Sequence, residues 1–262
     1  MGSKIIGLDA WLQTPPGRYL LAWERSRFDE AVADIFGYHA LQLGLPQLNT
    51  LASNRMPHRW LGCEPNGSTS STTHLPADFL TDFSALPFSE ASLDLVSLPH
   101  ALEFSADPHL TLREVERVLV PDGKVVISCL NPASLWGLRQ QRAHLYGRMG
   151  WGEPYLPEAG EFIAYRRLRD WLRLLGFEVE SARFGCYRPA VMTEAWLERT
   201  AWMDGLGQRW WPIFGAAYFL VAIKRVRGMR LISPAWKARK IVATAPVSIA
   251  GKHANTLASR DK

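Results

Sequence analysis

Residues 78–132 read DFLTDFSALPFSEASLDLVSLPHALEFSADPHLTLREVERVLVPDGKVVISCLNP, and their alternation of apolar runs with polar turns decides the fold. A short strand ends at Asp82, a buried strand covers residues 93–98, and a Val/Ile-rich strand covers residues 124–128. A helix separates the last two strands. Strands that alternate with helices predict a parallel sheet of βα units, which is an α/β fold.

The carboxyl ends of these strands predict a ligand crevice. In an open parallel sheet, ligands bind outside the carboxyl ends of the strands. Asp82, the loop formed by Pro99 and His100, and residues 129–131 all follow predicted strands. We therefore expect them to face one crevice.

The helix within this stretch has clear boundaries. Asp107 is a good N-cap, because its carboxylate can accept a hydrogen bond from a free N–H of the first turn, and Pro108 suits the first helical position. Apolar residues recur at helical spacing up to Leu119, while charged residues take the other side. Glu114 and Arg117 are close enough to pair. The turn ending at Gly123 leads into the next strand.

The composition predicts a globular protein of the cytoplasm. A chain of 262 residues with 47% hydrophobic residues can bury one substantial core. Cys63, Cys129 and Cys186 have neither metal-site spacing nor a disulfide pattern, which favours reduced thiols. No secretion signal opens the chain, and the longest apolar run, residues 213–223, is too short to span a bilayer.

The sequence divides into three parts. Residues 1–36 form an N-terminal segment with an amphipathic helix over residues 18–36, which we expect to cover the crevice mouth. Residues 37–228 form the main domain, in which a weak helix at residues 47–54 is expected after the first strand. Residues 229–262 form a basic tail that we expect to be disordered.

The tail concentrates the positive charge. From residue 224 onward lie ten of the 30 Lys and Arg residues but one of the 25 acidic residues. Such a tail can make weak contacts with the phosphates of RNA or of an anionic surface, which are the candidate partners of residues 229–262. A solubilising terminus without a partner is the alternative.

Several motifs together resemble one known family. The run T-D-F-x-x-L-P-F-x-x-x-S-L-D-L-V is followed by H-x-L-E-F-x-x-D-P and by L-R-E-V-x-R-V-L-x-P-D-G over residues 81–127. This combination resembles the methyltransferase type 11 group of class I S-adenosylmethionine-dependent methyltransferases. The segments FGYHALQLGLP and NPASLWGLRQ, at residues 36–46 and 131–140, resemble an uncharacterised bacterial branch of it.

The resemblance covers residues 15–226 and implies a Rossmann-like sheet of seven strands with helices on both faces. The last strand, at residues 216–224, would be antiparallel. It also implies S-adenosylmethionine as the cofactor and an unidentified methyl acceptor. The acceptor could be a small molecule, a protein or an RNA.

The resemblance assigns roles to residues of the crevice. Asp82 matches the acidic residue after the third strand, whose carboxylate accepts a hydrogen bond from the adenine amine, while the N–H of Phe83 addresses the ring. Glu64 follows Gly44 by 20 residues, the spacing at which nucleotide-binding folds place a ribose ligand. A turn cap at Asp82 and an exposed loop glutamate at Glu64 are the alternatives.

The first βα turn departs from the family pattern. The family has an acidic residue followed by three alternating glycines, whereas this chain has Gln42-Leu43-Gly44-Leu45-Pro46-Gln47. Only Gly44 allows the close backbone approach that the cofactor needs. We expect an adjusted or weakened cofactor site, or none. The alternative function is therefore a non-catalytic binding or regulatory protein, associated with RNA through its basic tail.

His100 is the candidate catalytic base, because it follows the fourth strand and an acceptor that holds a proton needs a base. A histidine bonded to a loop carbonyl is the alternative. Glu103 and His109 are weaker candidates, and His39 belongs to strand packing. No metal motif is present, and the absence of G-x-G-x-x-G argues against an NAD dehydrogenase.

The segment over residues 183–215 is rich in tryptophan and arginine. It could form a substrate platform through stacking and cation–π contacts, but its helical spacing favours packing of these aromatics against the sheet. Residues 147–160, rich in glycine and proline, are the expected lid or rim of the crevice.

Overall fold

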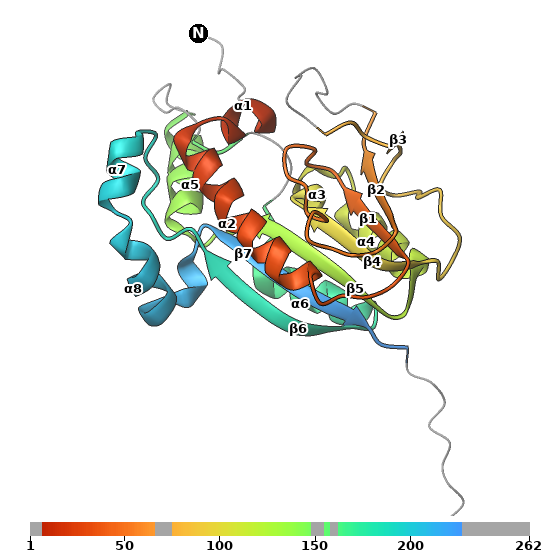
Figure 1. Ribbon diagram of the computed structural model, residues 1–262. Helices are drawn as coiled ribbons and strands as arrows, with labels where there is room; N and C mark the ends of the chain where they lie inside the picture. The colour runs from red at the N-terminus through yellow and green to blue at the C-terminus, as the bar shows by residue number, and fades with distance from the viewer. Residues whose placement is uncertain (1–6, 66–74, 148–154, 158–161, 227–262) are drawn as a thin grey trace, which may run out of the picture. The chain divides into compact units, whose positions relative to one another are not determined.

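Seven strands form one sheet in the computed structural model, which describes residues 7–65, 75–147, 155–157 and 162–226 (Figure 1). Their order across the sheet is β3-β2-β1-β4-β5-β7-β6. The strands from β3 to β5 are mutually parallel, and β7 is antiparallel to both of its neighbours. The strands are β1 (His39–Leu43), β2 (His58–Cys63), β3 (Phe79–Leu80), β4 (Leu93–Pro99), β5 (Leu119–Leu130), β6 (Phe177–Gly185) and β7 (Ala217–Lys224). This arrangement confirms the predicted fold class.

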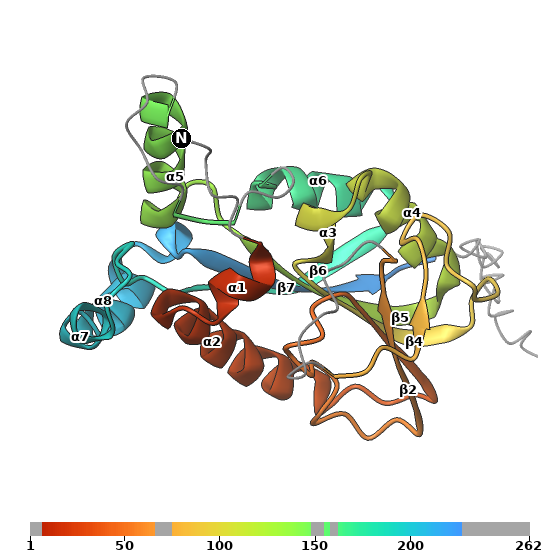
Figure 2. The same ribbon diagram turned by 90° about the horizontal axis from the view of Figure 1, so that it is seen from above.

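Helices cover both faces of this sheet. The α-helices are α1 (Leu8–Leu12), α2 (Pro15–Val32), α3 (Ala101–Phe104), α4 (Pro108–Val118), α5 (Leu135–Gly147), α6 (Tyr165–Leu174), α7 (Glu194–Arg199) and α8 (Trp202–Trp210), and η1 (Pro212–Phe214) is a short 3₁₀ helix. Figure 2 shows α2 on one face and α3, α4 and α6 on the other. None of the described helices is both long and apolar enough to cross a membrane.

Alternate residues of the central strands feed two separate cores. In β4, Leu95 joins the core beneath α2, whereas Val96 and Leu98 join the core beneath α4 and α6. This is the pattern of strands whose two faces are both covered, and it explains why the central strands read as continuous apolar runs.

The predicted helix after Asp107 is α4. Oδ1 of Asp107 accepts hydrogen bonds from the N–H groups of His109, at 2.9 Å, and Leu110, at 3.1 Å. Leu112, Val115 and other apolar residues of the helix are buried against the sheet. The cap and the apolar stripe were both legible in the sequence.

The N-terminal helix begins earlier than predicted. Pro15 and Pro16 form the first turn of α2, behind an N-cap hydrogen bond of 3.4 Å from the Gly17 N–H to Oγ1 of Thr14. The helix ends at Val32 and packs against β5 and β7, where the rings of Phe28 and Phe219 meet edge to face with centroids 4.9 Å apart.

The connection from β1 to β2 contains turns and no helix, so the predicted helix at residues 47–54 is wrong. Hydrogen bonds from side chains to the backbone compete with helical ones here. Oδ1 of Asn54 accepts from the Met56 N–H at 2.9 Å, and its amide donates to the carbonyl of Val32 at 2.8 Å. A cavity of about 440 Å³, lined in part by Arg59 and Trp60, lies beside this connection.

Two predicted segments fall wholly or mostly outside the described residues. These are the tail at residues 229–262 and most of the expected lid at residues 147–160. The three cysteines are buried and unpaired with one another, as expected of reduced thiols.

Candidate functional site

The candidate site lies at the edge of the sheet where the parallel strands end. Gly44 follows β1, Glu64 follows β2, Asp82 lies two residues past β3, and His100 follows β4. Pro99 is the last residue of β4, where it pairs in register with Ser128 of β5. The topology thus brings the predicted site residues to one edge, as expected from a parallel sheet.

Gly44 makes the sharp turn after β1. Its φ is +76°, which glycine adopts without a steric penalty, and the next residue, Leu45, also has a positive φ of 46°. The space where a Cβ would stand at Gly44 is bordered by the Phe83 ring at 3.7 Å and by Ala101 at 3.8 Å. A side chain at this position would therefore meet ordinary contacts, and it is the positive φ that favours glycine.

Gln42 holds this turn in place from within. Its amide nitrogen donates to the carbonyls of Gly44 and Leu45, each at 3.1 Å, and of Leu48, at 2.7 Å. Its oxygen accepts from the N–H and the hydroxyl of Thr50, at 2.9 and 2.8 Å. Where the family pattern has an acidic residue, this chain has a buried amide that is fully engaged with its own backbone.

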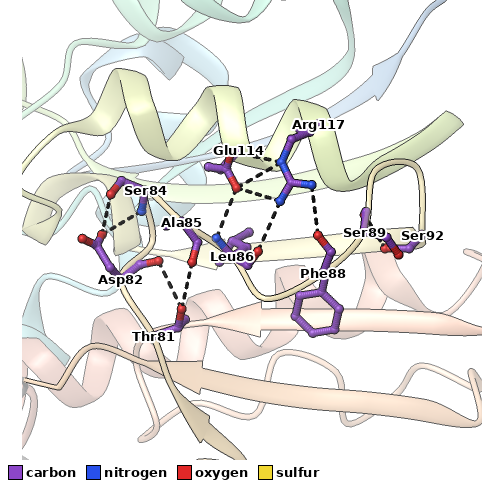
Figure 3. A network of polar contacts seen from close by, with 10 residues as sticks. All are labelled: Thr81, Asp82, Ser84, Ala85, Leu86, Phe88, Ser89, Ser92, Glu114 and Arg117. Atoms are coloured by element: carbon purple, nitrogen blue, oxygen red, sulfur yellow. Dashed lines mark hydrogen bonds and ion pairs between the residues drawn. The ribbon is translucent and has the colours of Figure 1, made fainter.

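Asp82 is exposed two residues past β3, and the structure shows the turn cap that was the alternative to its predicted adenine-binding role. Its Oδ1 accepts hydrogen bonds from the N–H and the hydroxyl of Ser84, both at 2.8 Å, which caps the turn (Figure 3). These bonds lower the pKa of Asp82, so it is ionised at neutral pH. Its Oδ2 makes no hydrogen bond to any described residue and stays open to a ligand.

Glu64 and the backbone of Phe83 complete an acceptor and donor set beside Asp82. Burial, and after it the negative charge of Asp82, raise the pKa of Glu64, which shows that the two carboxyl groups are electrostatic neighbours. The N–H of Phe83 has no hydrogen-bond partner among the described residues. Glu64 and Asp82 are thus near each other at the ends of β2 and β3, and the N–H of Phe83 directly follows Asp82 in the chain.

Helix α4 fixes the chain that follows Asp82. Arg117 donates to the carbonyl of Phe88 at 3.0 Å and to that of Leu86 at 3.2 Å, while Glu114 accepts from the Leu86 N–H at 3.2 Å (Figure 3). The predicted pairing of Glu114 with Arg117 is present, at 2.9 Å. The pair also holds residues 86–88, which form the Leu-Pro-Phe turn. The helical spacing of Glu114 and Arg117 did not indicate this role.

His100 lies in a buried ion cluster with Glu24 and Glu103. Its Nδ1 is 2.6 Å from Oε2 of Glu103 and its Nε2 is 2.9 Å from Oε1 of Glu24, and all three side chains are at most 1% exposed. The Nε2–Glu24 contact is ionic, because the geometry does not make it a hydrogen bond. Oε1 of Glu103 accepts from the Leu130 N–H at 2.5 Å, which ties the cluster to β5.

This environment keeps His100 protonated. Burial alone would lower its pKa, but the charges of Glu24 and Glu103 outweigh burial and raise the pKa to about 10. A protonated, enclosed imidazole has no lone pair with which to abstract a proton. The geometry weighs against the predicted role of His100 as a base, and its catalytic assignment stays a prediction.

Glu24 was not among the predicted site residues. In the sequence it belongs to the polar side of an amphipathic helix, 76 positions before its partner His100. Both of its carboxylate oxygens are buried without a hydrogen-bond donor among the described residues, as are the hydroxyls of Ser97 and Ser128. Only the tertiary fold reveals this polar layer beneath α2.

The remaining histidine candidates lie away from the crevice. His109 is an exposed residue of α4 whose ring meets that of Trp171, with centroids 3.8 Å apart. His39 stacks with Trp60 at the opposite end of β1. No group of three or more potential metal ligands occurs in the described parts of the chain.

The aromatic segment does not pack as predicted. Trp196, Trp202, Trp210 and Trp211 are all exposed, while Leu197 and Gly207 make the buried contacts of α7 and α8. The expectation that helical spacing buries these tryptophans against the sheet is therefore wrong.

The residues at the ends of β2 and β3 fit the adenosine part of S-adenosylmethionine. Glu64 and Asp82 are acceptors suited to ribose hydroxyls and to an exocyclic amine, and the Phe83 N–H is a donor suited to a ring nitrogen. At the first turn, the fit rests on Gly44 alone, because the polar atoms of Gln42 are used within the turn.

Comparisons with known proteins agree with this geometry. A family described as a methyltransferase domain matches residues 51–127. The uncharacterised protein YafS of Escherichia coli strain K12 is 34% identical over 184 residues, which are 70% of each chain. A malonyl-[acyl-carrier protein] O-methyltransferase of Coxiella burnetii is 39% identical over 54 residues, 21% of this chain and 19% of that protein.

A solved structure shares the fold. A chain from the complex of the Haloferax volcanii Trm112 methyltransferase activator with a methyltransferase superposes with a TM-score of 0.55 and 17% identity, covering 84% of this chain and 96% of that one. At this identity the likeness supports the fold alone. Taken with the motifs of residues 81–127, the strand order and the YafS match, these findings show that the chain belongs to the type 11 group of class I S-adenosylmethionine-dependent methyltransferases.

Proposed function

We propose that this protein transfers the methyl group of S-adenosylmethionine to an acceptor that is not yet identified. The observation that carries the proposal is the set formed by Glu64, Asp82 and the Phe83 N–H at the ends of neighbouring strands. Each has a free hydrogen-bonding position, and together they match the donors and acceptors of an adenosine.

The chain's own residues would bind and orient the reactants. S-adenosylmethionine would supply an electrophilic methyl group, and the rate of its transfer would depend on how well the acceptor atom is aligned with that group. Gly44, which has no side chain, would let the cofactor approach the backbone of the first turn, and Arg117 holds the segment behind Asp82. The cluster of Glu24, His100 and Glu103 fixes the loop after β4, so we assign His100 a positioning role.

The state of His100 narrows the class of acceptor. Because this imidazole is protonated and enclosed, we propose an acceptor that needs no base from it, such as a carboxylate or a neutral amine. The Coxiella relative is named an O-methyltransferase, and a carboxylate oxygen is one acceptor of this kind.

Calorimetric titration of the full chain with S-adenosylmethionine tests the proposal. We expect saturable binding, about tenfold weaker in Asp82→Ala, because the variant loses a charge-assisted hydrogen bond to the adenine amine. Glu64→Gln should also weaken binding. Asp170→Ala is the matched control, since Asp170 is an exposed carboxylate on the outer side of α6.

Two results would contradict the proposal. Unchanged affinity in Asp82→Ala would remove the adenine assignment. If S-adenosylmethionine at about 1 mM produces no binding heat and no rise in melting temperature, the protein does not use this cofactor, since a ligand of the folded state must stabilise it. The comparisons lend no support to the alternative of a non-catalytic protein.

A further inference from the structure

One end of the molecule exposes an unusual amount of apolar side chain. Eight large apolar residues between residues 192 and 214 are 40% to 71% exposed, and we call them the tryptophan surface. They are Met192, Trp196, Trp202, Leu206, Trp210, Trp211, Ile213 and Phe214. All four exposed tryptophans of the described residues are among them. Isolated exposed apolar residues are ordinary, but a concentration of this kind marks an interaction surface.

The backbone beneath the tryptophan surface is firmly held. The hydroxyl of Tyr187 donates to the carbonyl of Pro212 at 2.8 Å, and the amide of Asn131 donates to the carbonyls of Ile213, at 2.7 Å, and Gly215, at 2.9 Å. Gly207 packs so closely on Tyr187 that a Cβ there would lie 2.3 Å from the ring. The outward direction of the tryptophans is therefore built into the fold.

This surface lies at the same edge of the sheet as the candidate site. β6 runs parallel to β5, because both are antiparallel to β7, and α7 and α8 follow the carboxyl end of β6. Figures 1 and 2 both place α7 and α8 beyond that end of the sheet. Asn131, directly after β5, bonds the segment that carries Ile213, so the two regions are physically joined.

The charges around the tryptophan surface favour an anionic partner. Arg199 and Arg209 lie within it, and Arg199 stands over the Trp196 ring at 5.7 Å. The segment has three carboxylates: Asp204 pairs with Arg188 at 2.9 Å, Glu194 pairs with Arg18 at 3.5 Å, and Glu198 is exposed on α7. With the two arginines that pair, four arginines therefore accompany three carboxylates. Further along the sequence, residues 227–262 contain eight Lys and Arg residues and one Asp.

The side-chain types separate a lipid surface from a nucleic acid. Tryptophan is enriched where membranes meet water, because its ring is apolar and its N–H is polar. Nucleobases would stack on the aromatic rings, but Met192, Leu206 and Ile213 have no aromatic face to offer them. Aliphatic side chains beside tryptophan and arginine suit the boundary between headgroups and acyl chains.

We propose that the tryptophan surface docks this protein reversibly on an anionic lipid bilayer. Its aromatic and aliphatic side chains enter the interfacial layer, and Arg199 and Arg209 meet the lipid phosphates. The inference is independent of the methyl acceptor and of cofactor binding.

Co-sedimentation of the full-length protein with vesicles tests the proposal. We expect binding to phosphatidylcholine vesicles that contain about 30% phosphatidylglycerol, with weaker binding to phosphatidylcholine alone and in about 0.5 M NaCl. Substitution of Trp196, Trp202 and Trp210 by serine should lower the partition coefficient at least about tenfold, because three interfacial side chains are lost.

Two controls keep the result specific. Phe36→Ser combined with Tyr38→Ser removes two apolar side chains that are 76% and 71% exposed outside the tryptophan surface, and it should bind like the wild type. Quenching of tryptophan emission by brominated lipid should occur in the wild type and decrease in the triple variant. Melting curves and circular dichroism establish that each variant is folded.

Four outcomes would overturn the proposal. The first is that the protein does not bind vesicles, and the second is that the triple variant and the Phe36/Tyr38 control lose vesicle binding equally. The third is that deletion of residues 227–262 abolishes vesicle binding while the tryptophan substitutions have no effect on it. The fourth is tryptophan-dependent binding of single-stranded RNA or of a second copy of the chain, seen by gel filtration, with no vesicle binding.

Discussion

Gln42 shows how one side chain can substitute for a missing sequence motif. Three of its hydrogen bonds run from its amide N–H groups to backbone carbonyls, so its chemistry as a donor is essential. The acidic residue of the family pattern could not make these bonds, because a carboxylate is an acceptor only. The first turn of this protein is therefore incompatible with the family residue.

Gln42→Glu should destabilise the protein by about 2 to 4 kcal/mol, because three buried carbonyls lose their donor and face a negative charge. Urea unfolding followed by circular dichroism measures the loss. Gln141→Glu, at an exposed position of α5, is the matched control and should be near neutral. Equal stability of the two variants would show that the network does not support the turn.

The ion pairs of His100 should make stability depend on pH in a defined direction. Its pKa rises from 6.5 in the unfolded chain to about 10 in the folded protein. A raised pKa means that the stabilisation is complete below pH 6.5 and is lost as the pH rises from 6.5 toward 10. The stability difference between wild type and His100→Gln should therefore be constant below pH 6.5 and shrink above it.

Two measurements separate this effect from other titrations. Nuclear magnetic resonance should show one imidazole, absent from the spectrum of His100→Gln, that stays protonated at pH 8. Glu24→Gln should lower the pKa of that imidazole by removing the charge that contributes most to raising it. An imidazole that titrates near pH 6.5 in the wild type would refute the cluster.

The sequence predicted site residues where the signal was local. The positions of Asp82, Glu64 and Gly44 follow from strand ends, which apolar runs reveal. Glu24 was hidden because its partner lies 76 positions away, and nothing in an amphipathic helix marks one carboxylate as buried. The hydrogen bonds that Gln42 makes to the first turn could not be predicted for a related reason. They depend on turns in a segment for which the sequence predicted a helix.

At the scale of secondary-structure elements, α4 connects the core to the candidate site. Its inner face packs on the sheet, while Arg117 reaches back to the carbonyls that follow Asp82. The capping signal at Asp107 and the apolar spacing predicted this helix well. The clamp was not predicted, because the carbonyls that it binds are 29 and 31 positions away in the chain.

Arg117→Lys should loosen the Leu-Pro-Phe turn more than it unfolds the protein. The planar guanidinium of Arg117 bonds two carbonyls and a carboxylate at once, which a lysine cannot do. Because the site is partly exposed, we expect the free energy of unfolding to fall by only about 1 kcal/mol. Hydrogen exchange at the Leu86 amide should accelerate about tenfold. Arg113→Lys is the control on the same helix, and identical exchange in both variants would contradict the clamp.

The connection from β1 to β2 illustrates the limit of local patterns. Leu45, Leu48 and Leu51 recur every three residues and are all buried, which resembles a helical face. Pro46 and the bonds made by Asn54 instead favour turns, and Gln42 stabilises them from the neighbouring strand. In this connection, the spacing of apolar residues predicted correctly which side chains are buried, but it predicted a helix where the chain forms turns.

At the scale of the whole molecule, one stretch of 55 residues was enough to predict the architecture. Residues 78–132 contain two central strands and the helix between them, and the resemblance carried by their motifs implies a sheet of seven strands with an antiparallel last strand. The sequence did not predict which large apolar side chains are exposed to solvent. The tryptophans of α7 and α8 have the spacing of core residues, but the buried side of these helices is lined by Leu197 and Gly207.

The position of β7 sets the order in which the fold can assemble. β7 inserts between β5 and β6, and all eight of its residues are buried. Until Lys224 leaves the ribosome, the long strand β5 keeps an open edge and β6 has no partner in the sheet. Unpaired strand edges are prone to aggregate, so we expect the nascent chain to be vulnerable to aggregation until β7 has been synthesised.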